Sequence, residues 1–380
     1  MTAAEAGVGP AVRPPRAPLW ARLVADPRVQ AAVARTPVLR RLARRDGDAL
    51  MDLVAGFVHS QVLLAVVELR LLHRLMEGGP QGAAALAAGA GVEAGRMAVL
   101  LDAAAALGLV RRGRRDGRYR IARRGAALLG VPGLEGMIRH HPALYADLAD
   151  PVAFLRGEGE GALAAFWPYV LGAGAAGDGV VAERYSRLMA ESQGLVAAET
   201  LARVDLSGAR EVLDVGGGTG AFLAALGARH PGPRLHLFDL PAVVPAARER
   251  FDAAGLGPRA RVTAGSFRDG PLPHGADAAT LVRVLYDHED STVAALLSAL
   301  RDTLPPGGRV IVSEPMRGEP APTRAGDAYF AFYTMAMGTG RTRRPSDIGA
   351  LLWGAGFDRV RDHGTSRPFV THVVSARKPG

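Results

Sequence analysis

The segment from Glu211 to Gly220, Glu-Val-Leu-Asp-Val-Gly-Gly-Gly-Thr-Gly, constrains the fold more than any other part of this chain. Its first five residues predict a short buried strand, its glycines a tight turn, and the apolar pattern that follows a helix. Glycines at such a turn adopt φ > 0 and let a ligand approach the main chain closely. A second apolar strand, 234–238, ends at Asp239, which lies 19 positions after Gly220, about where a βαβ nucleotide site needs a carboxylate. Together these features predict an adenosine-containing ligand at the carboxyl edge of a parallel sheet.

The charge of this turn separates the adenosine ligands from one another. Asp214 precedes the first glycine, and the spacing differs from the Gly-x-Gly-x-x-Gly of NAD enzymes. A negative charge suits a cationic ligand better than a pyrophosphate, which prefers the bare amides of a helix N-terminus. S-adenosylmethionine, which carries an ammonium and a sulfonium, meets this requirement. NAD, or a tight turn without a ligand, is the alternative interpretation.

Strand and helix patterns alternate from residue 206 onward, which predicts a doubly wound α/β sheet. The expected strands are 211–215, 234–238, 260–264, 278–284, 309–314 and 371–376. Ligands of such sheets bind beyond the carboxyl ends of the strands. The candidate site residues therefore follow the strands: Asp214 to Gly220, Asp239, Leu240, Ser266, Phe267, Tyr286 to His288, and Glu314.

The N-terminal half is predicted to be mainly helical. A long helix is expected over 48–77, and its apolar surface is so wide that burial at a subunit interface is favoured. Helices at 83–90 and 93–107 and a hairpin over 109–121 are typical of a winged helix, whose basic wing suggests DNA. The second helix, however, has only Arg96 and Asp102 as polar side chains that could reach the bases, and it has no Asn, Gln or Lys for base recognition. We therefore expect no nucleic-acid partner.

Residues 131–200 are predicted to be helical, with a glycine-rich interruption at 172–179. Their aromatic side chains belong either to the core or to an apolar substrate pocket, and the sequence does not separate the two: Tyr145, Phe154, Phe166, Trp167, Tyr169 and Tyr185. The predicted organisation is a basic arm (1–47), a winged-helix-like domain (48–130), a helical connector and substrate lid (131–200), and a ligand-binding α/β domain (201–380).

The net charge of +9 is concentrated at the N-terminus, where residues 1–48 carry nine arginines against four acids. Leu19, Trp20 and Leu23 are interleaved with them, so the arm is either a solvated tail or a segment attracted to anionic lipid. The chain has no cysteine, which excludes disulfides and thiolate chemistry and is compatible with a reducing compartment. We expect no signal peptide, membrane span or metal site, and a cytoplasmic location with peripheral association at the membrane face.

These motifs resemble the S-adenosylmethionine-dependent O-methyltransferase family often called plant-type, over roughly residues 49–378. The resemblance implies a Rossmann-like methyltransferase sheet, an N-terminal winged-helix dimerisation domain, a homodimer, and S-adenosyl-L-methionine as the cofactor. It places the cofactor on Asp214, Gly216, Gly218, Gly220, Asp239, Leu240, Ser266, Phe267 and Arg283. Ser266 stands where the family usually has an aspartate.

The chain departs from the family at the catalytic motif. The family pattern Val-Leu-His-Asp-Trp is Val-Leu-Tyr-Asp-His at 284–288, so Tyr286 replaces the general base and His288 the tryptophan. Glu314 and Asp347 match the two carboxylates that flank that base. A neutral tyrosine, with a reference pKa of ~10, is a weak proton acceptor. We therefore expect Tyr286 to orient a substrate hydroxyl and His288 to act as base, with Glu314 as the other candidate acceptor and His140-His141 contributing from the lid.

Among bacterial members, this arrangement most resembles the carotenoid 1-hydroxyl O-methyltransferases, as do the arginine-rich arm and the sequence Phe-Val-His-Ser-Gln at 57–61. The resemblance implies a hydrophobic acceptor, the tertiary 1-hydroxyl of an acyclic carotenoid. The bacteriochlorophyllide C-methyltransferases, which share the family, or another small-molecule O-methyltransferase, are the alternatives. A non-catalytic regulator with a methyltransferase fold or a winged helix is the alternative outside the enzymes.

Overall fold

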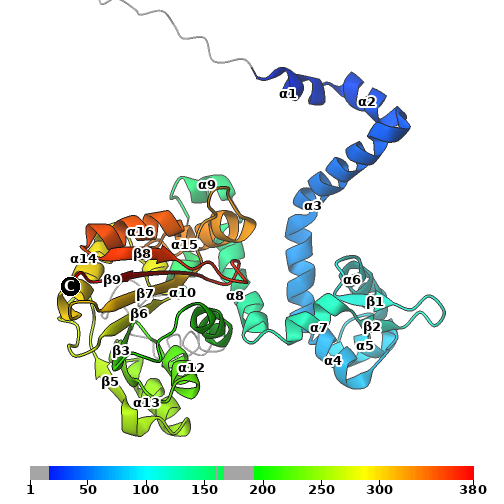
Figure 1. Cartoon of the computed structure of the whole chain (residues 1–380). Helices are drawn as coiled ribbons and strands as arrows, with labels where there is room; N and C mark the ends of the chain where they lie inside the picture. The colour runs from blue at the N-terminus through cyan, green and yellow to red at the C-terminus, as the bar shows by residue number, and fades with distance from the viewer. Residues whose placement is uncertain (1–16, 160, 167–191) are drawn as a thin grey trace, which may run out of the picture. The chain divides into compact units, whose positions relative to one another are not determined.

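The computed structural model describes residues 17–159, 161–166 and 192–380, and the chain divides into two compact units, 1–65 and 66–380 (Figure 1). In the first unit the described residues form α1 (Leu19–Val24), α2 (Pro27–Arg35) and most of α3 (Pro37–Glu68). No residue of α1 or α2 is buried, and Phe57 of α3 is 73% exposed. By length and composition α3 could cross a membrane over Leu39–Glu68.

The long N-terminal helix is broken where the sequence predicts continuity. We expected one helix over 48–77, and this was wrong: α3 ends at Glu68, and a separate helix, α4, spans Leu71–Gly78. Arg70, between them, adopts a left-handed φ of 53°. The apolar spacing runs across the break because both helices bury leucines and valines, so periodicity alone does not reveal the turn.

The winged helix is present in the second unit. It consists of α4, α5 (Ala83–Ala90), α6 (Ala94–Ala106), the hairpin of β1 (Val110–Arg112) and β2 (Tyr119–Ile121), and α7 (Arg123–Leu129). Glu93 caps α6 by accepting hydrogen bonds from two backbone amides. The buried Tyr119 donates its phenol hydrogen to Asp102 at 2.7 Å, so one of the two polar groups of α6 is bound to the hairpin.

A set of helices follows the winged helix and precedes the sheet: α8 (Leu134–Asp147), α9 (Pro151–Leu155), α10 (Ala162–Phe166) and a further helix at 192–203. The π-helix η5 (Arg324–Phe330) and α15 (Ala331–Ala336) pack with α8 and α10 around one apolar cluster, which includes Leu144, Phe154 and Tyr333. Phe154 therefore belongs to this cluster, whereas Trp167, Tyr169 and Tyr185 lie outside the described residues.

The α/β domain contains a seven-stranded sheet in the order β5-β4-β3-β6-β7-β9-β8. β3 to β7 are parallel, and β9 pairs antiparallel with both β7 and β8. The strands are β3 (Glu211–Val215), β4 (Arg234–Asp239), β5 (Ala260–Ala264), β6 (Ala278–Val282), β7 (Arg309–Glu314), β8 (Asp358–Asp362) and β9 (His372–Arg377). All six predicted strands are present, β6 ends at Val282 instead of 284, and β8 was missed because it is mostly exposed and charged.

Helices cover both faces of the sheet, as predicted. The remaining elements are α12 (Ala221–Arg229), α13 (Val244–Ala253), η3 (Gly257–Arg259), η4 (Leu285–Asp287), α14 (Asp290–Thr303) and α16 (Pro345–Gly354). Alternate residues of β3 point to opposite sides: Val212 packs with α12, α13 and the helix at 192–203, and Leu213 with α14 and α16. The strand order reverses between β3 and β6, so a crevice for a ligand is expected at their carboxyl ends.

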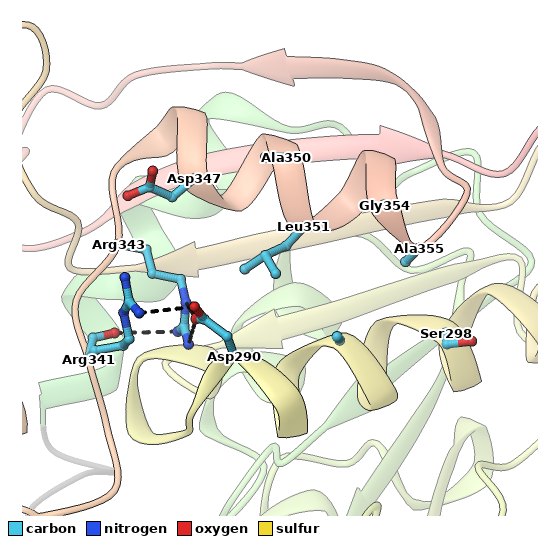
Figure 2. A pocket seen from close by; sticks show the side chains of 10 residues that line it. Asp290, Ser298, Arg341, Arg343, Asp347, Ala350, Leu351, Gly354 and Ala355 are labelled. Carbon is cyan, nitrogen blue, oxygen red and sulfur yellow. Dashed lines mark hydrogen bonds and ion pairs between the residues drawn. The ribbon is translucent and has the colours of Figure 1, made fainter. Parts of the chain in front are cut away.

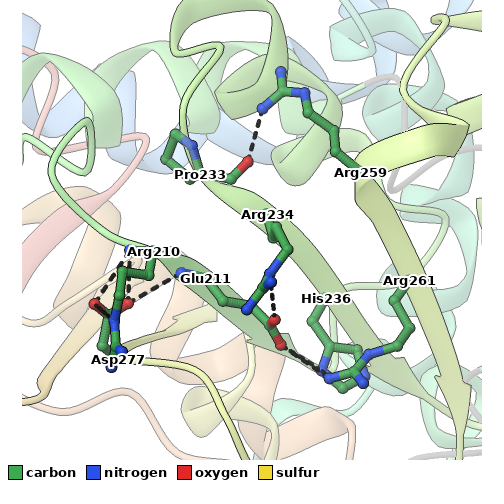
Figure 3. A network of polar contacts seen from close by, with 8 residues as sticks. All are labelled: Arg210, Glu211, Pro233, Arg234, His236, Arg259, Arg261 and Asp277. Atoms are coloured by element: carbon green, nitrogen blue, oxygen red, sulfur yellow. Dashed lines mark hydrogen bonds and ion pairs between the residues drawn. The ribbon is translucent and has the colours of Figure 1, made fainter.

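The opposite, amino ends of the strands carry an ionic network that holds neighbouring strands together (Figure 3). Glu211 at the start of β3 accepts hydrogen bonds from Arg234 at 3.1 Å and Arg261 at 2.9 Å. The buried imidazole of His236 lies next to Glu211 and accepts a hydrogen bond from Arg261. Burial lowers the pKa of His236, and the charge of Arg261 lowers it further. These charges stabilise the sheet at the edge away from the predicted site.

Candidate functional site

The glycine-rich turn and the acid after β4 are in direct contact. The Gly218 amide donates to Oδ2 of Asp239 at 2.6 Å, and the Leu240 amide donates to Oδ1 of the same side chain at 2.6 Å. Burial raises the pKa of Asp239, and these two hydrogen bonds lower it. The glycine-rich turn and Asp239, which the sequence predicted to form one site, are therefore joined by a hydrogen bond where the strand order of the sheet reverses.

Asp214 lies beneath the turn and is fully buried. Its Oδ1 accepts the hydroxyl hydrogen of Thr280 at 2.6 Å, which joins β3 to β6. Its Oδ2 has no hydrogen-bond partner among the described residues. Burial, helped by the charge of Asp239, raises the pKa of Asp214 to about 7. An acid in this state favours a cationic group as its missing partner.

The turn adopts its conformation because it is built of glycine. Gly216, Gly218 and Gly220 have φ values of +69°, +58° and +76°. A side chain at Gly216 would meet Val284 at 2.9 Å, whereas one at Gly218 would extend into open space. The open amide turn, the unpartnered oxygen of Asp214 and the carboxylate of Asp239 fit a cationic nucleoside such as S-adenosylmethionine.

The residues after β5 form the side of the site next to His288. The Arg268 amide donates to the Ser266 hydroxyl at 3.2 Å. The rings of Phe267 and His288 meet edge to face with centroids 5.3 Å apart. Arg268 donates to Nδ1 of His288 at 2.9 Å, so this nitrogen acts as an acceptor. Burial, followed by the charges of Arg268 and Arg343, lowers the pKa of His288 to about 4.

Tyr286 lies in the short helix η4, directly after the strained end of β6. Arg283 adopts a left-handed φ of 60°, which is costly for a residue with a side chain and is a frequent sign of a functional position. Its guanidinium donates to the Ser192 hydroxyl at 2.8 Å. Burial raises the pKa of the Tyr286 phenol, and Arg283 opposes this. The structure thus brings Arg283 close to Tyr286, and its assignment to the cofactor stays a prediction.

Two buried acids surround Tyr286. Oε2 of Glu314, at the end of β7, accepts the Tyr286 amide hydrogen at 3.1 Å, and its Oε1 has no hydrogen-bond partner among the described residues. Burial raises the pKa of Glu314 to about 7, although the charge of Arg343 opposes the shift. Asp287 is also buried, and its pKa is raised well above its usual range by burial.

Arg343 holds the turn that carries Tyr286, and this role was not predicted from the sequence. Its fully buried guanidinium donates to the carbonyls of Leu285 and His288, both at 2.8 Å, and forms an ion pair with Asp290 at 2.6 Å (Figure 2). A buried arginine with so many carbonyl partners fixes the backbone of η4. In the sequence Arg343 stands between Arg341 and Arg344, and nothing else marks it as the buried one.

A cavity of about 560 Å³ lies beside Arg343, between α14 and α16 (Figure 2). Asp347 lines this cavity, and its carboxylate accepts the amide hydrogen of Arg344 at 2.9 Å, which caps α16. The structure therefore gives Asp347 a helix-capping contact. Its assignment as a catalytic carboxylate stays a prediction.

Two histidines of α8 face two tyrosines of the segment after β7. Nε2 of His140 lies 2.8 Å from the hydroxyl of Tyr333, and Nε2 of His141 lies 2.8 Å from that of Tyr329. Burial lowers the pKa of His140 to about 4 and raises that of Tyr329. Neither tyrosine was predicted from the sequence. Their spacing of four residues, which puts them on one helical face, is the signal that could have found them.

This polar row adjoins the apolar cluster of α8, α9, α10 and α15. Phe154 and Phe332 stack with ring centroids 5.9 Å apart, and Leu144, Leu163 and Met337 belong to the same cluster. An apolar wall beside a few hydrogen-bonding groups is the usual composition of a site for a hydrophobic molecule with one polar group. Across residues 17–159, 161–166 and 192–380, no group of three His, Asp or Glu side chains could hold a metal ion.

Comparison with known proteins matches two domain families to this chain. The O-methyltransferase domain matches residues 145–358, and the O-methyltransferase dimerisation domain matches residues 51–130. Two similar relatives are demethylspheroidene O-methyltransferases. The one from Cereibacter sphaeroides is 56% identical, with 95% of each chain covered. The one from Rhodobacter capsulatus is 52% identical, with 98% of this chain and 93% of the relative covered.

A solved structure with the same fold is human N-acetylserotonin methyltransferase in complex with S-adenosylmethionine. Its TM-score to this chain is 0.73 at 27% identity, and the match covers 88% of this chain and 98% of that chain. The match therefore confirms the predicted fold class, and the two domain families confirm the predicted dimerisation domain and methyltransferase domain.

Proposed function

The chain belongs to the S-adenosylmethionine-dependent O-methyltransferase family, and from this premise we propose that its acceptor is the tertiary 1-hydroxyl of an acyclic carotenoid of the spheroidene type. The observation that carries the acceptor is the 56% identity to a demethylspheroidene O-methyltransferase along 95% of both chains. Tyr286 in place of the family histidine supports it, because an aliphatic alcohol poses a different proton-transfer problem from a phenol.

The cofactor is S-adenosylmethionine, whose sulfonium supplies an electrophilic methyl group when it is bound. We assign Asp239 to the ribose hydroxyls, since the Gly218 and Leu240 amides leave each of its oxygens a further lone pair. We assign Asp214 to the cationic methionine end, directly or through a water molecule. Ser266 and Phe267 complete the site on the β5 side, with His288 against the Phe267 ring.

The apolar acceptor is assigned to the wall formed by α8, α9, α10 and α15. The hydroxyls of Tyr329 and Tyr333, each held by a histidine, are suited to fix the acceptor oxygen by hydrogen bonds. The low pKa of His140 keeps its ring neutral, so the row adds no charge next to a hydrocarbon chain. Alignment of the acceptor oxygen at about 3–3.5 Å from the methyl carbon supplies much of the expected rate.

Glu314 is assigned as the proton acceptor. In the overall reaction a carbon–oxygen bond forms, the carbon–sulfur bond breaks, and the hydroxyl proton passes to a base. An effective base has a pKa near the working pH. Burial places Glu314 near this value, at about 7, and His288 far below it, at about 4. The choice of His288 from the sequence stays a prediction, and these pKa values favour Glu314, with Tyr286 orienting the hydroxyl.

Product identification tests the acceptor. Purified protein is incubated with labelled S-adenosylmethionine and, separately, with an acyclic 1-hydroxycarotenoid and a chlorin, and the products are identified by mass spectrometry. We expect a methyl ether from the hydroxycarotenoid and no labelled chlorin. Methylation of the chlorin alone would contradict the proposed acceptor and leave the family membership intact. If methyl is transferred to neither the hydroxycarotenoid nor the chlorin while the cofactor binds normally, the non-catalytic regulator is favoured.

Variants test the proton acceptor. Glu314→Gln is expected to lower kcat on the order of 100-fold or more while leaving the Kd of the cofactor unchanged. His288→Gln, its matched control, should lower kcat much less. Tyr286→Phe should raise the KM of the acceptor more than it changes kcat. If His288→Gln lowers kcat as strongly and Glu314→Gln does not, the base assignment passes to His288.

The matched dimerisation domain indicates that the protein functions as a homodimer. We propose that the exposed apolar side chains of α3, among them Leu53 and Phe57, are covered by a second copy of the chain. Their position at the start of the matched domain supports this assignment. It explains why so apolar a helix has so few buried residues in a single chain.

A further inference from the structure

We propose that residues 17–47, the basic arm, form a binding surface for an anionic lipid bilayer. This segment lies before the matched dimerisation domain, which begins at residue 51, so the dimerisation domain does not account for it. Its described residues contain seven arginines and only two acids, and none of them is buried.

The two first helices of the arm separate apolar from cationic side chains. In α1, Leu19, Trp20, Leu23 and Val24 fall within about 140° of the helix circumference, and Arg22 lies outside this arc. Trp20 is 69% and Leu19 70% exposed, although α1 packs against α2. An exposed tryptophan on an amphipathic helix is typical of a segment that lies at a membrane–water interface.

The same division continues in α2 and at the start of α3. In α2, Val29 and Val33 lie about 130° away from Arg28 and Arg35. At the start of α3, four exposed arginines occupy one side of the helix: Arg40, Arg41, Arg44 and Arg45. Their spacing of four residues places like charges side by side, which destabilises an isolated helix. Their side chains make no hydrogen bond or ion pair with the described residues, so an external anionic surface is the partner that relieves this repulsion.

The arm is at least partly shared with one of the relatives. The match to the human structure leaves 12% of this chain uncovered. The match to the Cereibacter sphaeroides relative leaves only 5% uncovered, so at least part of the arm is shared with that relative. The acceptor named for that relative is far more lipid-soluble than N-acetylserotonin. The interpretation that the arm brings the active site to a membrane-dissolved acceptor rests on the proposed function, whereas lipid binding itself does not.

Sedimentation with lipid vesicles tests the proposal without any activity measurement. The full-length protein is mixed with sucrose-loaded vesicles of phosphatidylcholine alone or with phosphatidylglycerol. We expect strong binding to the anionic vesicles, weak binding to the neutral ones, and release of the protein when salt is raised from about 0.1 M to about 0.5 M. Equal binding to both kinds of vesicle would overturn the proposal. Retention of the protein on the vesicles after the salt wash would also overturn it, because it indicates a helix that spans the bilayer.

Variants identify the surface. Replacing Arg40, Arg41, Arg44 and Arg45 together by Gln is expected to weaken partitioning on the order of 100-fold or more, since each cation near an anionic surface contributes about fivefold. The same four positions as Lys should retain binding. The matched control removes four exposed arginines of the wing instead, Arg111, Arg114, Arg115 and Arg118, and should leave binding within about twofold. A loss of equal size in the wing variant would assign binding to net charge and overturn the role of the arm.

Trp20 reports the apolar contact. Its emission should shift to shorter wavelength on anionic vesicles, and the shift should be absent in Trp20→Phe. The double variant Trp20→Ser, Leu23→Ser should bind at least about tenfold more weakly, because two exposed apolar side chains no longer enter the interface. Duplex DNA is the competing anion: retention of the protein on DNA through the same four arginines, with no vesicle binding, would contradict the lipid proposal.

Discussion

Replacing Asp214 by Asn is expected to weaken the binding of S-adenosylmethionine near neutral pH and to remove most of the pH dependence of that binding. Burial raises the pKa of Asp214 to about 7 in the free protein, and one of its oxygens has no hydrogen-bond partner among the described residues. A cationic ligand favours the ionised form, so the proton must leave before or during binding. Asn keeps the size of the side chain and the acceptor for the Thr280 hydroxyl, and it removes the charge.

The magnitude follows from the titration of one group. With a pKa of about 7, Asp214 is about 3% ionised at pH ~5.5 and about three-quarters ionised at pH ~7.5. The ratio of the cofactor affinity of the natural protein to that of Asp214→Asn should therefore rise about 25-fold across this range. Taking the ratio cancels the titration of the ligand's own amine. The rise of about 25-fold is the limit in which only the ionised form of Asp214 binds the cofactor, and binding by the protonated form makes the rise smaller.

Isothermal titration calorimetry measures both the Kd and the protons released. At pH ~7 the natural protein should release about half a proton on binding, seen as a dependence of the binding enthalpy on the buffer, and Asp214→Asn should release less. Asp302→Asn, which removes an exposed carboxylate at the end of α14, is the control and should behave as the natural protein. An affinity ratio that stays constant from pH ~5.5 to ~7.5 would refute the role of Asp214.

Three further predictions concern assembly and stability. Phe57→Asp should shift the dimer toward monomer in light scattering at micromolar concentration, whereas Val99→Asp, at an equally exposed apolar position of α6, should not. Arg343→Met should lower the free energy of unfolding by about 3–5 kcal/mol, because it leaves the carbonyls of Leu285 and His288 without a donor, whereas Arg341→Met should cost less than about 1 kcal/mol in chemical denaturation. The pKa of His288 is lowered to about 4, so as pH falls the unfolded chain takes up this proton before the folded chain does, and stability is lost between about pH 6.5 and 4. His288→Gln should remove up to about 3 kcal/mol of this loss, measured as the difference in the free energy of unfolding between these two pH values.

The cofactor half of the site could be predicted because it is local in sequence. β3, the turn and α12 are contiguous, and a parallel neighbour brings Asp239 to the same edge of the sheet. The contact between the Gly218 amide and Asp239 spans only 21 residues, and the chemistry of a βαβ unit dictates it. Most of the confirmed strands share this property, since they are apolar runs bounded by turn residues.

The acceptor half could not be predicted to the same extent, because its contacts join distant segments. His140 meets Tyr333 across 193 residues, and His141 meets Tyr329 across 188. No periodicity within one segment contains that information. Arg343 is a further case: three arginines of one loop look alike in the sequence, and only the packing of α14 and α16 shows that this one is buried against η4. The helix break at Arg70 was missed for a different reason, since the apolar spacing continues across a single left-handed residue.

The acids of the site act against the stability of the free protein, and this is evidence for what they bind. Asp214 and Glu314 have folded pKa values of about 7, well above those of the unfolded chain. For such a group the folded state holds the proton between about pH 4 and 7, so its contribution to stability is present at low pH and is lost as pH rises through about 7. A sequence selected for stability alone would replace these acids by amides or apolar groups of similar size. Asp214→Asn should therefore stabilise the free protein at neutral pH while it weakens cofactor binding, and these opposite signs distinguish a binding acid from a structural one. Glu314→Gln should likewise stabilise the fold and slow methyl transfer, because the same desolvation that makes its charge costly makes it a base at neutral pH.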